Sequence, residues 1–112
     1  MGELDNELYE QIKRHCRRGD ELAEEQQFEA ALTAYSAAWE LLPEPRTTWS
    51  AATWILAAIG DALFLAGDFE AGRDHLSMAM DCPDAIGNPF LHLRLGQCQV
   101  GAGQEDQGAQ PD

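Results

Sequence analysis

The stretches "GDELAEEQQFEAALTAYSAAWELLP", from Gly19, and "GDALFLAGDFEAGRDHLSMAMDCPD", from Gly60, decide the fold of this chain. Each begins with Gly-Asp, reaches Phe-Glu-Ala nine residues after its glycine, and closes with an apolar helical stripe that runs into a proline. Internal repetition of this length is typical of supersecondary units that stack on one another. The sequence therefore predicts a helical protein that offers partners a surface rather than a reaction centre.

Apolar residues recur at helical spacing along most of the chain, and no segment has the alternation of a strand. The spacing predicts helices over about 4–23, 28–42, 49–66, 69–82 and 89–100. The two prolines of "PEPRTT" end the second helix, and Thr47 or Thr48 is expected to cap the third. Asn88 is expected to cap the fifth helix, with Pro89 in its first turn.

This alternation of helices, Gly-Asp turns and prolines resembles the tetratricopeptide repeat, a degenerate pattern of about 34 residues per helix pair. The first unit carries the resemblance at Gly19, Leu22, Ala31, Tyr35, Ala38 and Pro43. The second carries it at Leu56, Ile59, Gly60, Leu63, Gly72, Leu76, Ala79 and Pro83, and a third copy begins with Leu95 and Gly96. His15 and Arg18 depart from the family, because apolar residues are usual at their positions.

The resemblance implies one helical domain over residues 1–102, followed by a disordered tail over residues 103–112. Repeat 1 would span about 12–45, repeat 2 about 53–86, and a partial repeat 3 about 89–102. The implied fold is all-α, with antiparallel helix-turn-helix repeats, about five helices in total, stacked as a short right-handed α-solenoid.

In this family the first helix of each repeat lines a concave groove that binds partners. Transferred residue by residue, the expected groove residues are Lys13, Arg17, Asp20, Glu24, Trp54, Ala57, Asp61, Phe64, Arg94 and Gln97. The carboxylates among them suit a basic or amphipathic segment. They disfavour a clamp for a peptide's terminal carboxylate, since Asp20 and Asp61 stand where that clamp needs asparagines. Core packing of Trp54 and Phe64 stays open as the alternative.

The third unit lacks its second helix, so the fifth helix is expected to leave an apolar edge open. Its residues are Phe90, Leu91, Leu93 and Val100. Exposed apolar patches usually mark interaction sites, which indicates docking of a partner or of a second copy of the chain. The alternative is that the first helix or the tail folds over this edge.

The formal net charge is −13, and the body of the chain carries all of it. Residues 1–18 hold four basic and four acidic groups, whereas the rest holds three arginines against sixteen acids. This excess repels nucleic acid and anionic lipid and favours basic partners. The run "AATWILAAIGDALFLAG" is short for a membrane span and contains Asp61, so no membrane association is expected.

No residues have the spacing of a catalytic or metal site. The three cysteines, Cys16, Cys82 and Cys98, form no Cys-x-x-Cys pair and are typical of a reducing cytoplasm. The His and Cys residues match neither zinc ligation nor a Cys-His nucleophile. We therefore expect a protein that is not an enzyme and holds no cofactor and no metal.

These observations predict a small cytoplasmic protein that acts by binding another protein with a basic or amphipathic surface. The first hypothesis is an acidic adaptor or inhibitor of a basic partner, for which a toxin-neutralising immunity protein is a concrete form. The second is an export or secretion chaperone that holds an apolar cargo segment, because one class of bacterial chaperones has about three such repeats. The third is a self-assembling structural module that forms a homodimer through the incomplete third repeat.

Overall fold

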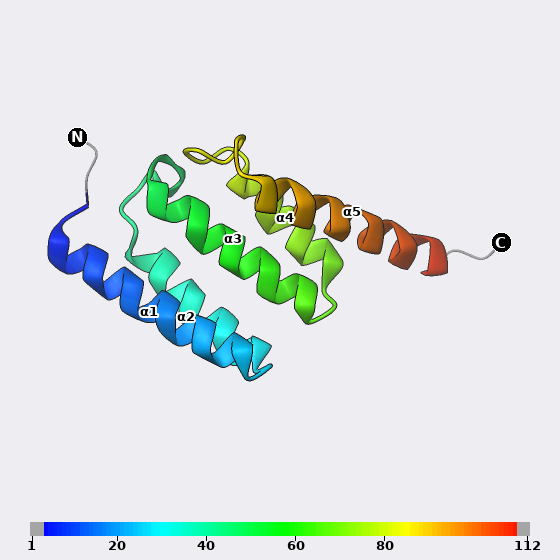
Figure 1. The fold of residues 1–112 in the computed structure, drawn as a ribbon, viewed down its shortest axis with the longest axis horizontal. Coiled ribbons are helices and arrows are strands. Elements are labelled where there is room, and N and C mark those ends of the chain that lie inside the picture. Colours follow the sequence, from blue (N-terminus) through cyan, green and yellow to red (C-terminus); the bar gives the residue numbers. More distant parts are fainter. Residues whose placement is uncertain (1–3, 110–112) are drawn as a thin grey trace.

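The computed structural model describes residues 4–109, and side chains over residues 4–103. Its α-helices are α1 (Asn6–Glu24), α2 (Phe28–Leu41), α3 (Ser50–Leu65), α4 (Phe69–Ala79) and α5 (Pro89–Ala109) (Figure 1). A short 3₁₀ turn at Arg46–Thr48 precedes α3. The described part of the chain contains no strand, so the all-α prediction is confirmed there.

The helices pack in the order of the sequence, each mainly against the next one (Figure 1). Helix α3 lies in the middle and also touches α1 and α5. It is apolar on almost every side, and its buried residues include Ile55, Leu56 and Ile59. The predicted central position of this helix is therefore confirmed, and it carries the core to which the other helices attach.

The turns α1–α2 and α3–α4 have the same backbone. Gln26 and Gly67 occupy the left-handed region, with φ of 64° and 88°. The next amide donates to a carbonyl five residues back in both turns, from Gln27 to Leu22 O and from Asp68 to Leu63 O, each at 2.9 Å. This is the Schellman arrangement that ends many helices. Both Gly-Asp stretches therefore fold into the same helix-turn-helix unit.

Glycines allow the paired helices to approach closely. A Cβ at Gly19 would overlap the Tyr35 ring of α2, and one at Gly60 would overlap the Leu76 side chain of α4. Tyr35 and Leu76 each follow their glycine by sixteen residues, so the same contact recurs in both pairs. The repeat seen in the sequence is thus a repeat of packing contacts.

The connection between α2 and α3 is held by Arg46 rather than by a threonine cap. Arg46 Nε donates to Trp39 O at 3.1 Å, and its Nη1 donates to Glu44 Oε2 at 2.7 Å. Trp49, not Thr47 or Thr48, is the residue that precedes α3, and its side chain makes no capping hydrogen bond. The predicted threonine cap is therefore wrong, because Thr48 Oγ1 donates back to Pro45 O instead.

The last two helices differ in length from the prediction. Helix α4 stops at Ala79, short of Cys82, whereas α5 continues beyond Val100 to Ala109. The backbone of residues 103–109, predicted to be disordered, is therefore helical, and residues 110–112 lie outside the described residues. Asn88 accepts from the amides of Phe90 and Leu91, at 3.0 and 3.3 Å, which confirms its predicted capping role.

Candidate interaction surface

The residues predicted to line the groove lie on α1, α3 and α5, with α3 between the other two helices (Figure 1). They fall into three groups with different contacts. The first group, Asp61, Phe64, Arg94 and Gln97, joins α3 to α5. The second, Lys13 and Trp54, joins α1 to α3. The third, Arg17, Asp20 and Glu24, lies on the second half of α1. Ala57 is half-buried on α3, whereas Arg17 and Glu24 are exposed on α1.

Arg94 of α5 is the centre of the first group. Its Nη2 lies 2.8 Å from Asp61 Oδ1 of α3, and its Nη1 donates to Gln97 Oε1 at 2.8 Å. The guanidinium also lies 4.3 Å from the ring centre of Phe64 and 5.4 Å from that of Phe90. The ion pair to Asp61 and the cation–π contact to Phe64 therefore fasten α5 to α3, and the contact to Phe90 lies within α5.

The ion pair changes the electrostatics expected at this position. The Asp61 and Arg94 side chains are only 34% and 19% exposed. Neither Asp61 Oδ1 nor Arg94 Nε has an aligned hydrogen-bond partner among the described residues, so the interaction is a charge contact rather than an aligned hydrogen bond. Asp61 was expected to be a free groove carboxylate, but its charge is already neutralised by Arg94.

In the second group, Trp54 of α3 contacts Tyr9 of α1. Their rings are in edge contact, with centres 6.4 Å apart and planes at 82°. Lys13 Nζ lies 5.1 Å above the Tyr9 ring and 3.8 Å from Glu10. Trp54 is 37% exposed, so core packing accounts for only part of its surface. Tyr9 was not predicted, although it lies one helical turn before Lys13 and so shares its face.

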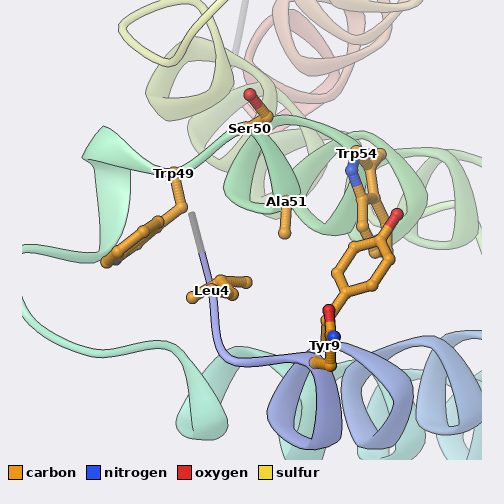
Figure 2. A pocket seen from close by; sticks show the side chains of 7 residues that line it. Leu4, Tyr9, Trp49, Ser50, Ala51 and Trp54 are labelled. Atoms are coloured by element: carbon orange, nitrogen blue, oxygen red, sulfur yellow. The ribbon is translucent and has the colours of Figure 1, made fainter. Parts of the chain in front are cut away.

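A pocket of about 300 Å³ lies beside this aromatic contact, between the start of α1 and the start of α3 (Figure 2). Figure 2 shows Leu4 and Trp49 on one side of it and the pair Tyr9 and Trp54 on the other. Asn6, Ser50 and Ala51 complete the lining. Three of its seven lining residues, Tyr9, Trp49 and Trp54, are therefore aromatic, and Trp54 is itself partly exposed.

Asp20, in the third group, has a partner inside its own helix pair. Tyr35 Oη donates to Asp20 Oδ1 at 2.6 Å, which ties α2 to α1. Burial is the main cause of the raised pKa of Tyr35, and its hydrogen bond to Asp20 adds to the shift. Asp20 thus stabilises the fold as well as contributing charge, and of the three predicted groove carboxylates only Glu24 has no such contact.

The predicted open edge of α5 is exposed at Phe90, Leu93 and Val100 but not at Leu91. Leu93 and Val100 are 61% and 63% exposed, whereas Leu91 is fully buried. Leu91 belongs to the stripe that packs inward with Cys98 and Ala102, so the prediction that it is part of the edge is wrong. Leu93 and Val100 instead line a shallow groove of about 620 Å³.

The remaining titratable groups show how charge is distributed over the surface. Within residues 4–103, five of the seven basic side chains form ion pairs, and Arg14 and Arg17 form none. Burial raises the pKa of all three cysteine thiols, that of Cys16 to about 12. These thiols are therefore protonated at neutral pH. Residues 4–103 contain no cluster of His, Cys, Asp and Glu side chains that could hold a metal ion.

None of the helices in the described part of the chain is both long enough and apolar enough to cross a bilayer. Comparison with known proteins found no match to any family model, to any curated protein or to any solved structure. The chain is therefore a small domain of five sequentially packed helices, and its function is argued from its own surface.

Proposed function

We propose that this protein is a non-enzymatic protein–protein interaction module built as a short tetratricopeptide-like stack. The two matching Schellman turns and the two matching glycine contacts support this family of folds. In the proposed role it is an acidic adaptor or inhibitor of a basic partner, and a toxin-neutralising immunity protein is the most concrete form. The partner-binding surface is the face made by α1, α3 and α5.

One observation carries this proposal: aromatic side chains lie exposed on a molecule whose free charges are mostly acidic. Trp54 and Phe90 are 37% and 40% exposed on that face. The acidic groups outnumber the basic ones by thirteen, so a net charge of −13 acts on approaching molecules. A field of this sign accelerates encounter with a basic protein, and partly exposed aromatic residues are typical of the centres of interfaces.

The test is capture of a partner from a lysate of the source cells by the tagged protein, eluted with a salt gradient. We expect a basic protein that elutes at moderate salt, because the carboxylates drive the encounter. The double variant Trp54→Ser, Glu24→Lys should lose that protein. The matched control Met78→Ser, Glu29→Lys also removes one partly exposed apolar side chain and reverses one charge, on α4 and α2, and should retain it. Equal capture by both variants would contradict the proposed surface.

The exposed apolar groove beside α5 favours a second candidate, a chaperone that holds an apolar segment of an export cargo. Such a complex would resist the salt gradient, because apolar contacts are little screened by ions. A self-assembling module is the third candidate, and it would sediment as a dimer without any partner. The salt profile and the sedimentation coefficient therefore separate the three roles.

A further inference from the structure

The groove beside α5 is built from the second helix pair, α3–α4, and from α5 itself, and is mostly apolar. Phe64 closes it from the end of α3 and Phe69 from the start of α4. Leu93 and Val100 form its other wall, and Gly101 provides the floor on which the Phe69 ring packs. Phe64 and Phe69 contact each other with ring centres 5.6 Å apart, so this wall is already ordered without a partner.

A sixth helix of the repeat is not the natural occupant of this groove. Gly96 corresponds to Gly60, and the residues one turn before and after Gly60 are Leu56 and Leu63, both buried. On α5 these positions are His92 and Gln99, which are exposed. The side of α5 that would meet a sixth helix is therefore polar, while the apolar Leu93 and Val100 lie on the adjoining side.

Two exposed carboxylates adjoin the groove residue Phe69 in the sequence, and we call them the rim of the groove. Asp68 and Glu70 flank Phe69 and are exposed, and neither forms an ion pair with any side chain of residues 4–103. The one Lys or Arg side chain of α5 is Arg94, and it already forms an ion pair with Asp61. A cationic side chain is therefore the complement of this rim. A second copy of the chain would instead bring another net charge of −13 to it.

We propose that this groove binds an amphipathic segment of the partner, with its apolar side chains between Phe69, Leu93 and Val100 and a lysine or arginine against Asp68 and Glu70. The inference rests on the proposed function and assigns to it a second contact area, separate from the Trp54 contact. It also makes the exposed apolar side chains of α5 an anchor site rather than an unfinished repeat.

The test uses a fluorescein-labelled synthetic peptide of leucine and lysine with an amphipathic helical pattern, followed by fluorescence anisotropy. One control peptide replaces every leucine with serine, and another replaces every lysine with glutamate. Both control peptides should bind at least about 10-fold more weakly, because the groove needs apolar burial and its rim needs a cation. Circular dichroism of each protein variant verifies that it is folded.

The protein variants locate the binding. Leu93→Ser, Val100→Ser should weaken the leucine–lysine peptide about 10-fold or more, since two apolar contacts are lost. Met78→Ser, Ile86→Ser also removes two exposed apolar side chains, away from the groove, and should leave affinity unchanged. Glu70→Gln should weaken binding about 2- to 5-fold at low salt, and Glu29→Gln, its counterpart beside Phe28, should not.

Three results would overturn the inference. The first is equal peptide affinity for the groove variant and its control. The second is equal affinity for the serine peptide, which would show charge attraction alone. The third is a wild-type dimer in sedimentation that the groove variant converts to monomer, which would make a second copy the occupant.

Peptide binding without capture of a basic protein from lysate would contradict the proposed function alone. Capture that is lost with Trp54→Ser, Glu24→Lys but kept with Leu93→Ser, Val100→Ser would contradict this inference alone.

Discussion

The helix pairs α1–α2 and α3–α4 have the same turn and the same glycine contact, but their aspartates have different partners. In α1–α2 the residue that covers the glycine is Tyr35, whose hydroxyl donates to Asp20. In α3–α4 it is Leu76, which has no polar atom, and Asp61 pairs with Arg94 of α5 instead. Where the residue opposite the glycine is Tyr35, the following aspartate therefore forms a hydrogen bond within its own helix pair. Where that residue is Leu76, the aspartate instead forms an ion pair with the next helix.

The largest expected effect comes from the glycine contact of the second pair. Gly60→Ala should destabilise the protein by about 2 kcal/mol, because the added methyl group overlaps Leu76. Leu76→Ala should cost about 3 kcal/mol, since Leu76 is fully buried. The double variant should cost clearly less than the two single costs added together, because the smaller side chain makes room for the methyl group. Urea unfolding of the wild type, the two single variants and the double variant completes the double-mutant cycle. Costs that simply add would contradict the contact.

The next largest effect is expected at alkaline pH, and it distinguishes corresponding positions of the two helix pairs. Cys16 and Tyr35 of the first pair correspond to Ala57 and Leu76 of the second, which do not titrate. Burial, and then the charge of Asp20, raises the pKa of Cys16 from 9.0 to about 12. The folded state therefore holds this proton more tightly than the unfolded state. The resulting contribution to the free energy of unfolding is complete below pH 9 and is lost as the pH rises towards about 12.

We expect the wild type to lose about 2 kcal/mol of unfolding free energy from this thiol between pH 8 and pH 10.5. In Cys16→Ala the decline over this interval should be shallower, whatever the cost of the substitution at neutral pH. Parallel pH profiles of the two proteins would rule out this role for Cys16.

The two turns provide a smaller test. Gln26 adopts a left-handed conformation that costs a residue with a Cβ about 1 kcal/mol, whereas Gly67 adopts it freely. Gln26→Gly should therefore stabilise the protein by about 1 kcal/mol, and Gly67→Gln should destabilise it by a similar amount. No atom lies near the Cβ position of Gly67, so the second effect isolates the backbone cost. Thermal unfolding measures both, and two changes of the same sign would contradict the prediction.

The smallest expected difference lies at the start of the second helix of each pair. Asp68 accepts a hydrogen bond from the Ala71 amide at 3.3 Å, whereas the corresponding Gln27 caps no amide. Gln27→Asp should add about 0.5 kcal/mol of stability, and Asp68→Ala should remove about 1 kcal/mol. Asp68→Asn, which keeps an acceptor, should stay close to wild type in the same thermal unfolding measurement. A loss with asparagine as large as that with alanine would show that charge, not capping, matters there.

The sequence predicts those features of the fold that depend on residues close together in the chain. Phe28 and Phe69 begin their helices where the repeated Phe-Glu-Ala predicts, and Asn88 caps α5 as expected. The end of α5 could not be predicted, because its glycines have low helix propensity. Packing overrides that propensity: Gly101 lies against Phe69, and Ala102 is fully buried.

The candidate surface was predicted less completely than the fold. Its helices and most of its residues, such as Trp54 and Phe64, follow from the repeat register. The pairing of Asp61 with Arg94 does not follow, since the two residues lie on different units and nothing in their local patterns links them. The open edge predicted for α5 was also wrong at Leu91, because Leu91 lies on the stripe with Cys98 and Ala102 that packs inward.

By itself the sequence determined the helices, their turns, the glycine register and the sign of the surface charge. These properties depend on residues a few positions apart or on composition alone. Only the tertiary structure decided which carboxylates are free, which side of α5 is apolar and where the groove lies. Those properties depend on distances between residues far apart in the chain, and such distances exist only once the helices have packed.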